Sequence, residues 1–153
     1  MPLAVTVRAV SASDFEAWLA LWNGYNAFYG REGTTALGSD VTRTTWHRFF
    51  DPEEPVFALV AEVEGKILGL VHFLHHRSTS RIELTCYLQD LFTAPEARGR
   101  GVGRALIEAV YDAARASGIR RVYWQTHEEN ATARTLYDQL ARHHGFIVYS
   151  HDV

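Results

Sequence analysis

A glycine-rich stretch is the part of the sequence whose residue types are best suited to chemistry. Residues 98–104 read RGRGVGR, with glycines at every second position, directly before a segment patterned as a helix. Glycine lets the backbone approach a ligand closely, and the free N–H groups that open a helix bind phosphate. Arg98, Arg100 and Arg104 would add positive charge. The spacing therefore favours a turn that holds an anion such as pyrophosphate, although a plain tight turn would use the same glycines.

Two widespread phosphate-binding motifs do not fit this stretch. The dinucleotide-binding pattern G-x-G-x-x-G/A would need a small residue at Arg104 or at Leu106. The P-loop needs a Lys and a Ser or Thr after its last glycine, and neither follows here. A short turn in front of a helix is the arrangement that is left.

Composition indicates a single globular domain that spans residues 1–153. The chain is 47% hydrophobic and 22% charged, which suits one packed core. Its formal net charge of -3 argues against a nucleic-acid partner. The most apolar run, residues 67–74, is too short to cross a bilayer, and the first residues lack a signal-peptide pattern, so we expect a cytoplasmic protein without a membrane partner. Cys86 is the only cysteine, and its apolar surroundings favour packing over nucleophilic chemistry.

The apolar patterns predict an α/β protein, with a mixed sheet of six strands flanked by four helices. Two apolar runs around the turn Glu64-Gly65 predict an antiparallel hairpin. Ser13 and Glu16 fit a capping box at the start of the first helix. A strand, helix and strand between residues 87 and 126 predict a parallel right-handed crossover. The predicted strands are 3–10, 56–63, 66–76, 81–93, 120–126 and 146–150, and the predicted helices are 13–29, 39–50, 101–117 and 130–144.

The glycine-rich turn also carries a family resemblance. The run Arg98-Gly99-Arg100-Gly101-Val102-Gly103 matches [Q/R]-x-x-G-x-[G/A], the signature with which GNAT superfamily N-acetyltransferases hold the pyrophosphate of coenzyme A. Residues 87–110 resemble the fourth strand, pyrophosphate loop and third helix of this family, and residues 130–137 resemble its next element. The sequence is most similar to the small-amine branch, which includes diamine acetyltransferases, and to the small histone and D-amino-acid acetyltransferases.

This resemblance implies a GNAT-like fold and an N-acetyltransferase whose co-substrate is acetyl-CoA. The acetyl group would pass directly to a primary amine of a small molecule, such as a polyamine or an amino acid. Two alternatives stay open. One is acetylation of a lysine in a histone or another protein, and the other is an acyl-CoA-binding module without turnover.

The resemblance also implies which groups bind acetyl-CoA. In the family, two strands diverge at a β-bulge, the pantetheine pairs with the freed backbone groups, and an N–H near Leu91 would polarise the acetyl carbonyl. Tyr137 would be the general acid for the departing thiolate, or a packed aromatic residue. Asn130 would bond to backbone or pantetheine groups, or cap a helix. The implied acetyl-CoA-binding residues are Leu91, Phe92, Thr93, Arg98, Gly99, Arg100, Gly101, Val102, Gly103, Arg104, Asn130, Ala133 and Tyr137.

Several residues compete for the role of catalytic base. Diamine acetyltransferases carry a Glu-Asp pair on the fourth strand, where this chain has Gln89 and Asp90. Strand alternation would turn Asp90 away from the face of Gln89 unless a bulge changes the phase, and a structural ion pair is an alternative role for Asp90. Glu83 on the same strand is another candidate base, as is water relayed from His72 or His76.

The resemblance places acceptor binding on the first two helices and the loop between them. Trp22, Tyr25 and Tyr29 would form an aromatic wall, or belong to the core. Glu32 would meet an ammonium group, and Gln89 would add a contact from the fourth strand. The eight histidines show no metal-ligand spacing, so we expect no metal.

The end of the sequence suggests a further partner. After FIVYSHDV the chain stops, whereas many family members continue into a seventh strand. An exposed sheet edge would result, and we expect a homodimer in which partner strands cover each other.

Overall fold

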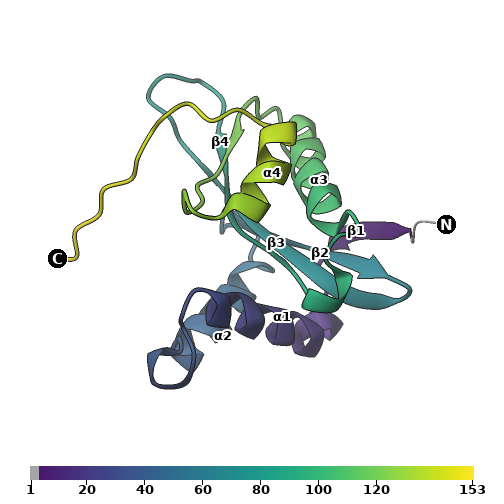
Figure 1. The fold of residues 1–153 in the computed structure, drawn as a ribbon. Helices are drawn as coiled ribbons and strands as arrows, with labels where there is room; N and C mark the ends of the chain where they lie inside the picture. Colours follow the sequence, from purple (N-terminus) through teal and green to yellow (C-terminus); the bar gives the residue numbers. More distant parts are fainter. Residues whose placement is uncertain (1–3) are drawn as a thin grey trace.

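The computed structural model describes residues 4–153 (Figure 1). Short 3-10 turns at Ala12–Asp14, Gly33–Thr35 and Pro95–Ala97 connect its main elements. None of the helices within residues 4–153 has the length and apolar character needed for a membrane crossing. The main elements, in chain order, are β1 (Val5–Ala9), α1 (Phe15–Phe28), α2 (Ser39–Arg48), β2 (Val56–Val63), β3 (Lys66–His76), β4 (Thr85–Thr93), α3 (Val102–Ala116), β5 (Val122–Tyr123) and α4 (Ala131–Leu140).

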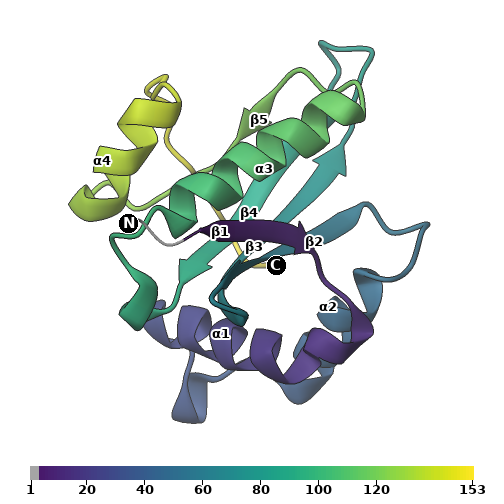
Figure 2. The same cartoon turned by 90° about the vertical axis from the view of Figure 1, so that its right-hand side faces the viewer.

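A five-stranded sheet in the order β1-β2-β3-β4-β5 lies between two layers of helices (Figures 1 and 2). The first four strands pair antiparallel, and β5 pairs parallel to β4. Helices α1 and α2 pack on one face around Trp18, Trp46 and Leu70. Helix α3 crosses the other face and packs through Leu106, Ile107 and Val110. The neighbouring β3 residues Leu70 and Val71 therefore serve opposite cores, as the period of a strand requires.

The predicted hairpin is confirmed, and so is the parallel pairing of the strands that the predicted crossover joins, β4 and β5. β2 and β3 meet at Glu64 and Gly65, whose φ angles of 52° and 76° are those of a tight hairpin turn. Helix α3 ends where predicted, because Gly118 follows its C-cap with a φ of 72°. Its first turn lies tightly against β3, since a Cβ at Gly69 would come within 2.6 Å of Cγ1 of Val102.

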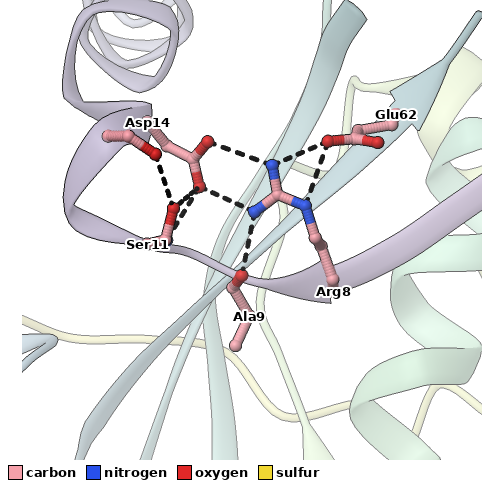
Figure 3. A network of polar contacts seen from close by, with 6 residues as sticks. Arg8, Ala9, Ser11, Asp14 and Glu62 are labelled. Carbon is pink, nitrogen blue, oxygen red and sulfur yellow. Dashed lines mark hydrogen bonds and ion pairs between the residues drawn. The ribbon is translucent and has the colours of Figure 1, made fainter. Parts of the chain in front are cut away.

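An ionic network fixes the start of α1, two residues before the predicted capping box. Arg8 on β1 donates hydrogen bonds to the carboxylates of Asp14 and Glu62, at 2.7 Å each (Figure 3). The Asp14 carboxylate also accepts two hydrogen bonds from Ser11, one from its backbone N–H at 2.7 Å and one from its hydroxyl at 3.2 Å. The predicted box at Ser13 and Glu16 is therefore wrong, because the pair that closes is Ser11 and Asp14. The bonds from Arg8 lower the pKa of Asp14 to about 2.

The prediction of a sixth strand at residues 146–150 is wrong, since the described sheet has five strands. This segment pairs with no described strand, and the side chains of Phe146, Ile147 and Tyr149 are exposed. Its alternating apolar residues fit a strand, but a strand also needs a neighbour for its backbone hydrogen bonds. In Figure 1 the C-terminal segment extends away from α4 without touching the sheet.

Several other predicted elements are shorter in the structure. The strand predicted at 120–126 is the two-residue β5, and the one predicted at 81–93 starts at Thr85. The helix predicted to reach 144 ends at Leu140, where the chain turns extended at Ala141 and Tyr111 donates a hydrogen bond to the carbonyl of Leu140. Of the strand predicted at 3–10, residue 3 lies outside the described residues.

Candidate active site

A cavity of about 610 Å³ opens where β4, α1, α3 and α4 meet. It joins the glycine-rich turn, the end of β4 and the aromatic end of α1 in one space. The described residues that line it are Tyr25, Phe28, Tyr29, Leu91, Phe92, Thr93, Ala97, Arg98, Gly99, Gly101, Val102, Gly103, Arg104, Asn130, Thr132, Ala133, Leu136 and Tyr137.

The glycine-rich turn presents the open N-terminus of α3 to this cavity. Gly99 and Gly101 have φ angles of 78° and 82°, in the left-handed region that favours glycine. Gly101 is the N-cap residue and has no side chain to accept a hydrogen bond. The first helical bond runs from the N–H of Ala105 to Gly101, so the N–H groups ahead of Ala105 are available to an anion. Arg98 and Arg104 line the cavity, whereas Arg100 does not.

The second feature of the cavity is the outer edge of β4. This strand pairs with β5 only at Cys86 and Tyr87. Beyond Tyr87 the two strands diverge, so the backbone groups on that edge have no partner strand within the described residues. Leu91, Phe92 and Thr93 all line the cavity along this edge. An extended ligand can therefore add to β4 as a further strand would.

A β-bulge at Gln89 changes the phase of β4. His72 of β3 is opposite Asp90 while Phe73 is opposite Leu88, which leaves Gln89 as the extra residue. Leu88 accordingly packs in the α3 core, and Asp90 turns to the opposite face toward α1. The possibility that a bulge shifts Asp90 is thus confirmed. Gln89 itself is exposed and does not line the cavity.

Asp90 is tied into a buried chain of hydrogen bonds. Its Oδ2 lies 2.9 Å from Nδ1 of His72, and Nε1 of Trp18 donates to Nε2 of the same imidazole at 2.9 Å. Burial raises the pKa of Tyr25 well above its ordinary value, and the charge of Asp90 together with its interaction with the Tyr25 hydroxyl raises it further. Asp90 therefore has a structural partner in His72, and its charge acts on Tyr25, which lines the cavity.

Tyr137 and Asn130 reach the cavity from α4. Burial, with a smaller contribution from Tyr29, raises the pKa of Tyr137 to about 12, so its phenol holds its proton at neutral pH. The ring packs edge-on against Trp124, with centroids 5.4 Å apart. Asn130 is the N-cap of α4 and accepts a hydrogen bond from the N–H of Ala133 at 3.4 Å, so the helix-capping alternative is confirmed.

The aromatic wall of the cavity differs in part from the predicted one. Tyr25 and Tyr29 are in it, with ring centroids 4.9 Å apart. Trp22 is 6% exposed and belongs to the core beneath Tyr25. Glu32 is exposed and does not line the cavity. Phe28, which the sequence analysis did not select, completes the wall.

The other candidate bases lie away from the cavity. Glu83 precedes β4 and forms an ion pair with Arg81 at 3.4 Å. His76 interacts with the hydroxyl of Tyr123 at 2.7 Å and does not line the cavity. Cys86 is fully buried, which raises its thiol pKa to about 12 and fits a packing role. No group of three or more potential metal ligands occurs among the described residues.

Several lining residues carry no sequence signal of their own. Ala97, Thr132 and Leu136 are small or apolar residues next to the recognised motifs, and their spacing alone would not select them. Trp18, which the sequence analysis did not select, is fully buried. Its hydrogen bond to His72 spans 54 positions of the chain, a distance that no local pattern reveals.

Comparison with known proteins agrees with this architecture. The pattern of the Acetyltransferase (GNAT) family matches residues 18–146. The D-amino-acid N-acetyltransferase HPA3 of Saccharomyces cerevisiae is 37% identical over 139 residues, which cover 90% of this chain and 84% of HPA3. The uncharacterized N-acetyltransferase YhfO of Bacillus subtilis is 30% identical over 135 residues, which cover 88% of this chain and 87% of YhfO.

Among solved structures, the aminoglycoside N-acetyltransferase AAC(6')-Iy in complex with CoA superposes with a TM-score of 0.81. It is 17% identical, and the match covers 99% of this chain and 97% of that one, which shows a shared fold. The family match and the relatives together establish what the chain is. It belongs to the GNAT family and is an acetyl-CoA-dependent N-acetyltransferase.

Proposed function

We propose that this enzyme transfers the acetyl group of acetyl-CoA directly to the primary amine of a small molecule. The observation that carries the proposal is the single cavity that joins an open helix N-terminus, an unpaired strand edge and an aromatic wall. Each of these three features suits one part of the two substrates. A direct transfer needs both substrates in one space, and this cavity provides it.

The N-terminus of α3 suits the pyrophosphate of coenzyme A. The N–H groups of Val102, Gly103 and Arg104 precede the first helical hydrogen bond, and they point toward the positive end of the helix dipole. The side chains of Arg98 and Arg104 add charge at the cavity wall. With the pyrophosphate there, the pantetheine arm would run along the open edge of β4.

The end of β4 suits the reacting thioester. A backbone N–H near Leu91 would donate to the acetyl carbonyl, and one such donor contributes about 3 kcal/mol of transition-state stabilisation. Tyr137 would donate its phenolic proton to the departing thiolate, since its raised pKa keeps it protonated and it lines the same cavity. Asn130 would hold the start of α4, and with it Tyr137, in position.

Among small amines, the cavity favours an amino acid over a polyamine. None of the described residues that line it is Asp or Glu, so a second ammonium group of a polyamine would find no carboxylate there. Arg31 lies behind the aromatic wall, with its guanidinium carbon 5.8 Å from the Tyr25 ring centroid and 5.6 Å from that of Tyr29. Its position is fixed by a 2.7 Å hydrogen bond to the side chain of Asn26. Arg31 does not line the cavity, but its positive charge beside the two rings would favour an acceptor carboxylate there, and the relative HPA3 is a D-amino-acid N-acetyltransferase.

A thiol-release assay tests the proposal. The protein is incubated with acetyl-CoA and one of three acceptor sets, namely D-amino acids, L-amino acids and linear diamines. We expect release with amino acids and little with diamines. The variant Arg31→Gln should raise KM for amino acids, because it removes the positive charge beside the aromatic wall. Preferential turnover of diamines, or an unchanged KM in Arg31→Gln, would contradict the amino-acid assignment.

We also propose that the enzyme is a homodimer joined through its C-terminal segment. Phe146, Ile147, Val148 and Tyr149 are all exposed in an extended segment, and contiguous exposed apolar residues mark an interaction surface. The outer edge of β5 is open in the described sheet, so a second copy can supply a strand there. Light scattering at micromolar concentration should give twice the chain mass, and Ile147→Asp should reduce it. A wild-type monomer would refute the dimer.

A further inference from the structure

We propose that His72 clamps Asp90 and so fixes the β-bulge that turns the N–H of Leu91 toward the cavity. Trp18 in turn holds the imidazole, so Trp18, His72 and Asp90 are positioning residues. This inference rests on the proposed role of the Leu91 N–H as a donor to the acetyl carbonyl. It gives Asp90 a function other than that of the catalytic base.

The bulge at Gln89 decides which backbone N–H groups of β4 face the open edge. In a regular strand, successive N–H groups alternate between the two edges. Before the bulge, Cys86 donates its N–H outward, to the carbonyl just before β5 at 3.0 Å. After the bulge, Ala94 donates inward, to a carbonyl of β3 at 2.8 Å, although regular alternation from Cys86 would turn it outward. The N–H groups of Leu91 and Thr93 therefore face the edge along which both residues line the cavity.

The hydrogen bond between His72 and Asp90 favours this bulged register. The two residues are cross-strand partners where the register shifts, and Nδ1 of His72 lies 2.9 Å from Oδ2 of Asp90. Without the bulge, Gln89 would be opposite His72. Asp90 would then be opposite Val71, whose side chain lies in the α3 core, and its carboxylate would be buried among apolar side chains. The N–H of Leu91 would also turn away from the cavity.

Trp18 fixes the tautomer that the clamp needs. Its indole N–H donates to Nε2 of His72 at 2.9 Å, and an indole N–H can only donate. Nε2 therefore carries no proton, and the imidazole proton sits on Nδ1, from which it is donated to Asp90. Trp18, His72 and Asp90 are 0%, 3% and 8% exposed, so solvent competes little for these hydrogen bonds.

Aromatic rings from the helix layer hold the imidazole in place. The ring centroid of Phe49, at the C-cap of α2, is 4.8 Å from that of His72, and the centroid of Trp22 on α1 is 5.0 Å away. Together with Trp18, these rings surround the imidazole from two helices. The clamp thus connects the layer of α1 and α2 with the strand that lines the cavity.

The first test compares two substitutions of Asp90. Asp90→Ala removes the acceptor of the clamp, whereas Asp90→Asn keeps an oxygen that accepts from Nδ1–H of His72. We expect Asp90→Ala to lower kcat about a hundredfold, as when one oxyanion donor is lost. Asp90→Asn should stay within about fivefold of the wild type. The Kd for CoA should stay close to that of the wild type in both. Equal hundredfold losses in both variants would make Asp90 a base and overturn the clamp.

A spectroscopic measurement separates the clamp from a general loss of stability. Infrared difference spectra of bound acetyl-CoA, labelled with ¹³C at the acetyl carbonyl, report how strongly this C=O bond is polarised. Wild-type protein and Asp90→Asn should lower its stretching frequency relative to free acetyl-CoA, and Asp90→Ala should not. Asp14→Ala is the matched control, because it removes another buried carboxylate, which pairs with Arg8 and does not line the cavity. It should lose stability and keep the lowered frequency.

Trp18→Phe is a milder variant, which decides the question if Asp90→Ala does not fold. It removes the indole N–H, so the ¹⁵N shifts of His72 should change from the Nδ1–H tautomer of the wild type to a mixture, with part of the frequency shift lost. A frequency shift kept in full by Asp90→Ala, or by Trp18→Phe, would overturn the clamp alone, as would an Nε2–H tautomer in the wild type. A wild type without any frequency shift would refute the proposed Leu91 donor, and the clamp with it.

Discussion

The substitution Gly101→Ala tests whether the glycine-rich turn holds coenzyme A. Gly101 has a φ of 82° and a ψ of 11°, and an L-residue in this region costs about 1 to 2 kcal/mol. A Cβ at this position would meet no other heavy atom of the protein within 4 Å, so backbone strain is the whole cost to folding. The new methyl group would stand at the cavity wall, where the proposed pyrophosphate would approach the N–H groups of α3. Losing one hydrogen bond to a charged group costs about 1.5 to 3 kcal/mol, or roughly tenfold to a hundredfold in Kd.

A matched control isolates the ligand effect from the strain. Gly65 has a φ of 76°, and a Cβ there would also meet no other heavy atom within 4 Å. It lies in the turn between β2 and β3 and does not line the cavity. Gly65→Ala should therefore lose about the same 1 to 2 kcal/mol of unfolding free energy as Gly101→Ala, and keep wild-type affinity for CoA.

Urea unfolding gives the unfolding free energy of each variant, and calorimetric titration gives its Kd for CoA. The reasoning requires equal stability losses and a Kd that rises only in Gly101→Ala. If both variants bind CoA as the wild type does, the pyrophosphate does not sit at this turn. If both lose affinity equally, the effect comes from destabilisation and the assignment again fails.

Three further predictions follow from the described side chains. Tyr137→Phe should lower kcat about tenfold or more and leave the Kd for CoA unchanged, and an unaltered kcat would exclude the acid role. Asp14→Asn should cost about 2 kcal/mol of unfolding free energy at neutral pH, because Arg8 lowers the pKa of Asp14 from 3.8 to about 2. Since this pKa is lowered on folding, the stabilisation is present above pH 4 and disappears as the pH falls toward 2. Asp112→Asn, which removes an exposed ion pair, is the control and should cost well under about 1 kcal/mol. Cys86 is fully buried, and its thiol pKa is raised to about 12, so it should react with a thiol reagent only after unfolding, which also keeps it silent in thiol-release assays.

Local patterns predicted those parts of the fold that depend on local physics. The hairpin at Glu64 and Gly65 needs two apolar runs and a turn of positive φ, and all of these are visible in the sequence. The start of α1 was misplaced because Ser11 and Asp14 have the same spacing as Ser13 and Glu16. The choice between these pairs is made by Arg8, through tertiary contacts that also involve β2.

The C-terminal strand shows the opposite case, in which a good local pattern is not sufficient. Residues 146–150 have the β-branched and aromatic composition of a strand, but no described strand offers them a paired edge. Backbone hydrogen bonds between strands are non-local, so a pattern of period two cannot tell whether a partner exists. The homodimer proposal supplies that partner from a second copy of the chain.

The active-site region shows the same difference between features set by local motifs and features set by contacts between distant residues. The glycine-rich turn and the α4 residues Ala133 and Tyr137 are neighbours in short motifs, and the structure places these motifs around one cavity. Asp90 and His72 were each considered singly, but the hydrogen bonds that join them to Trp18 bring together β4, β3 and α1. No spacing rule connects residues so far apart in the chain.

The β-bulge at Gln89 explains how Asp90 comes to lie on the α1 side of β4, close to the strand edge that lines the cavity. Without the bulge at Gln89, the alternation of β4 would put Asp90 on the same face as Leu88, in the apolar core under α3, where a carboxylate has no partner. The bulge turns Asp90 to the α1 face, next to His72. It also reverses every later position, so that Leu91 packs toward α3 and Phe92 toward α1. The strand thus places the carboxylate on one face just before the edge that is open to the co-substrate, and deleting Gln89 should remove the bulge while leaving Asp90 opposite His72, because Leu88 and Asp90 would then alternate regularly.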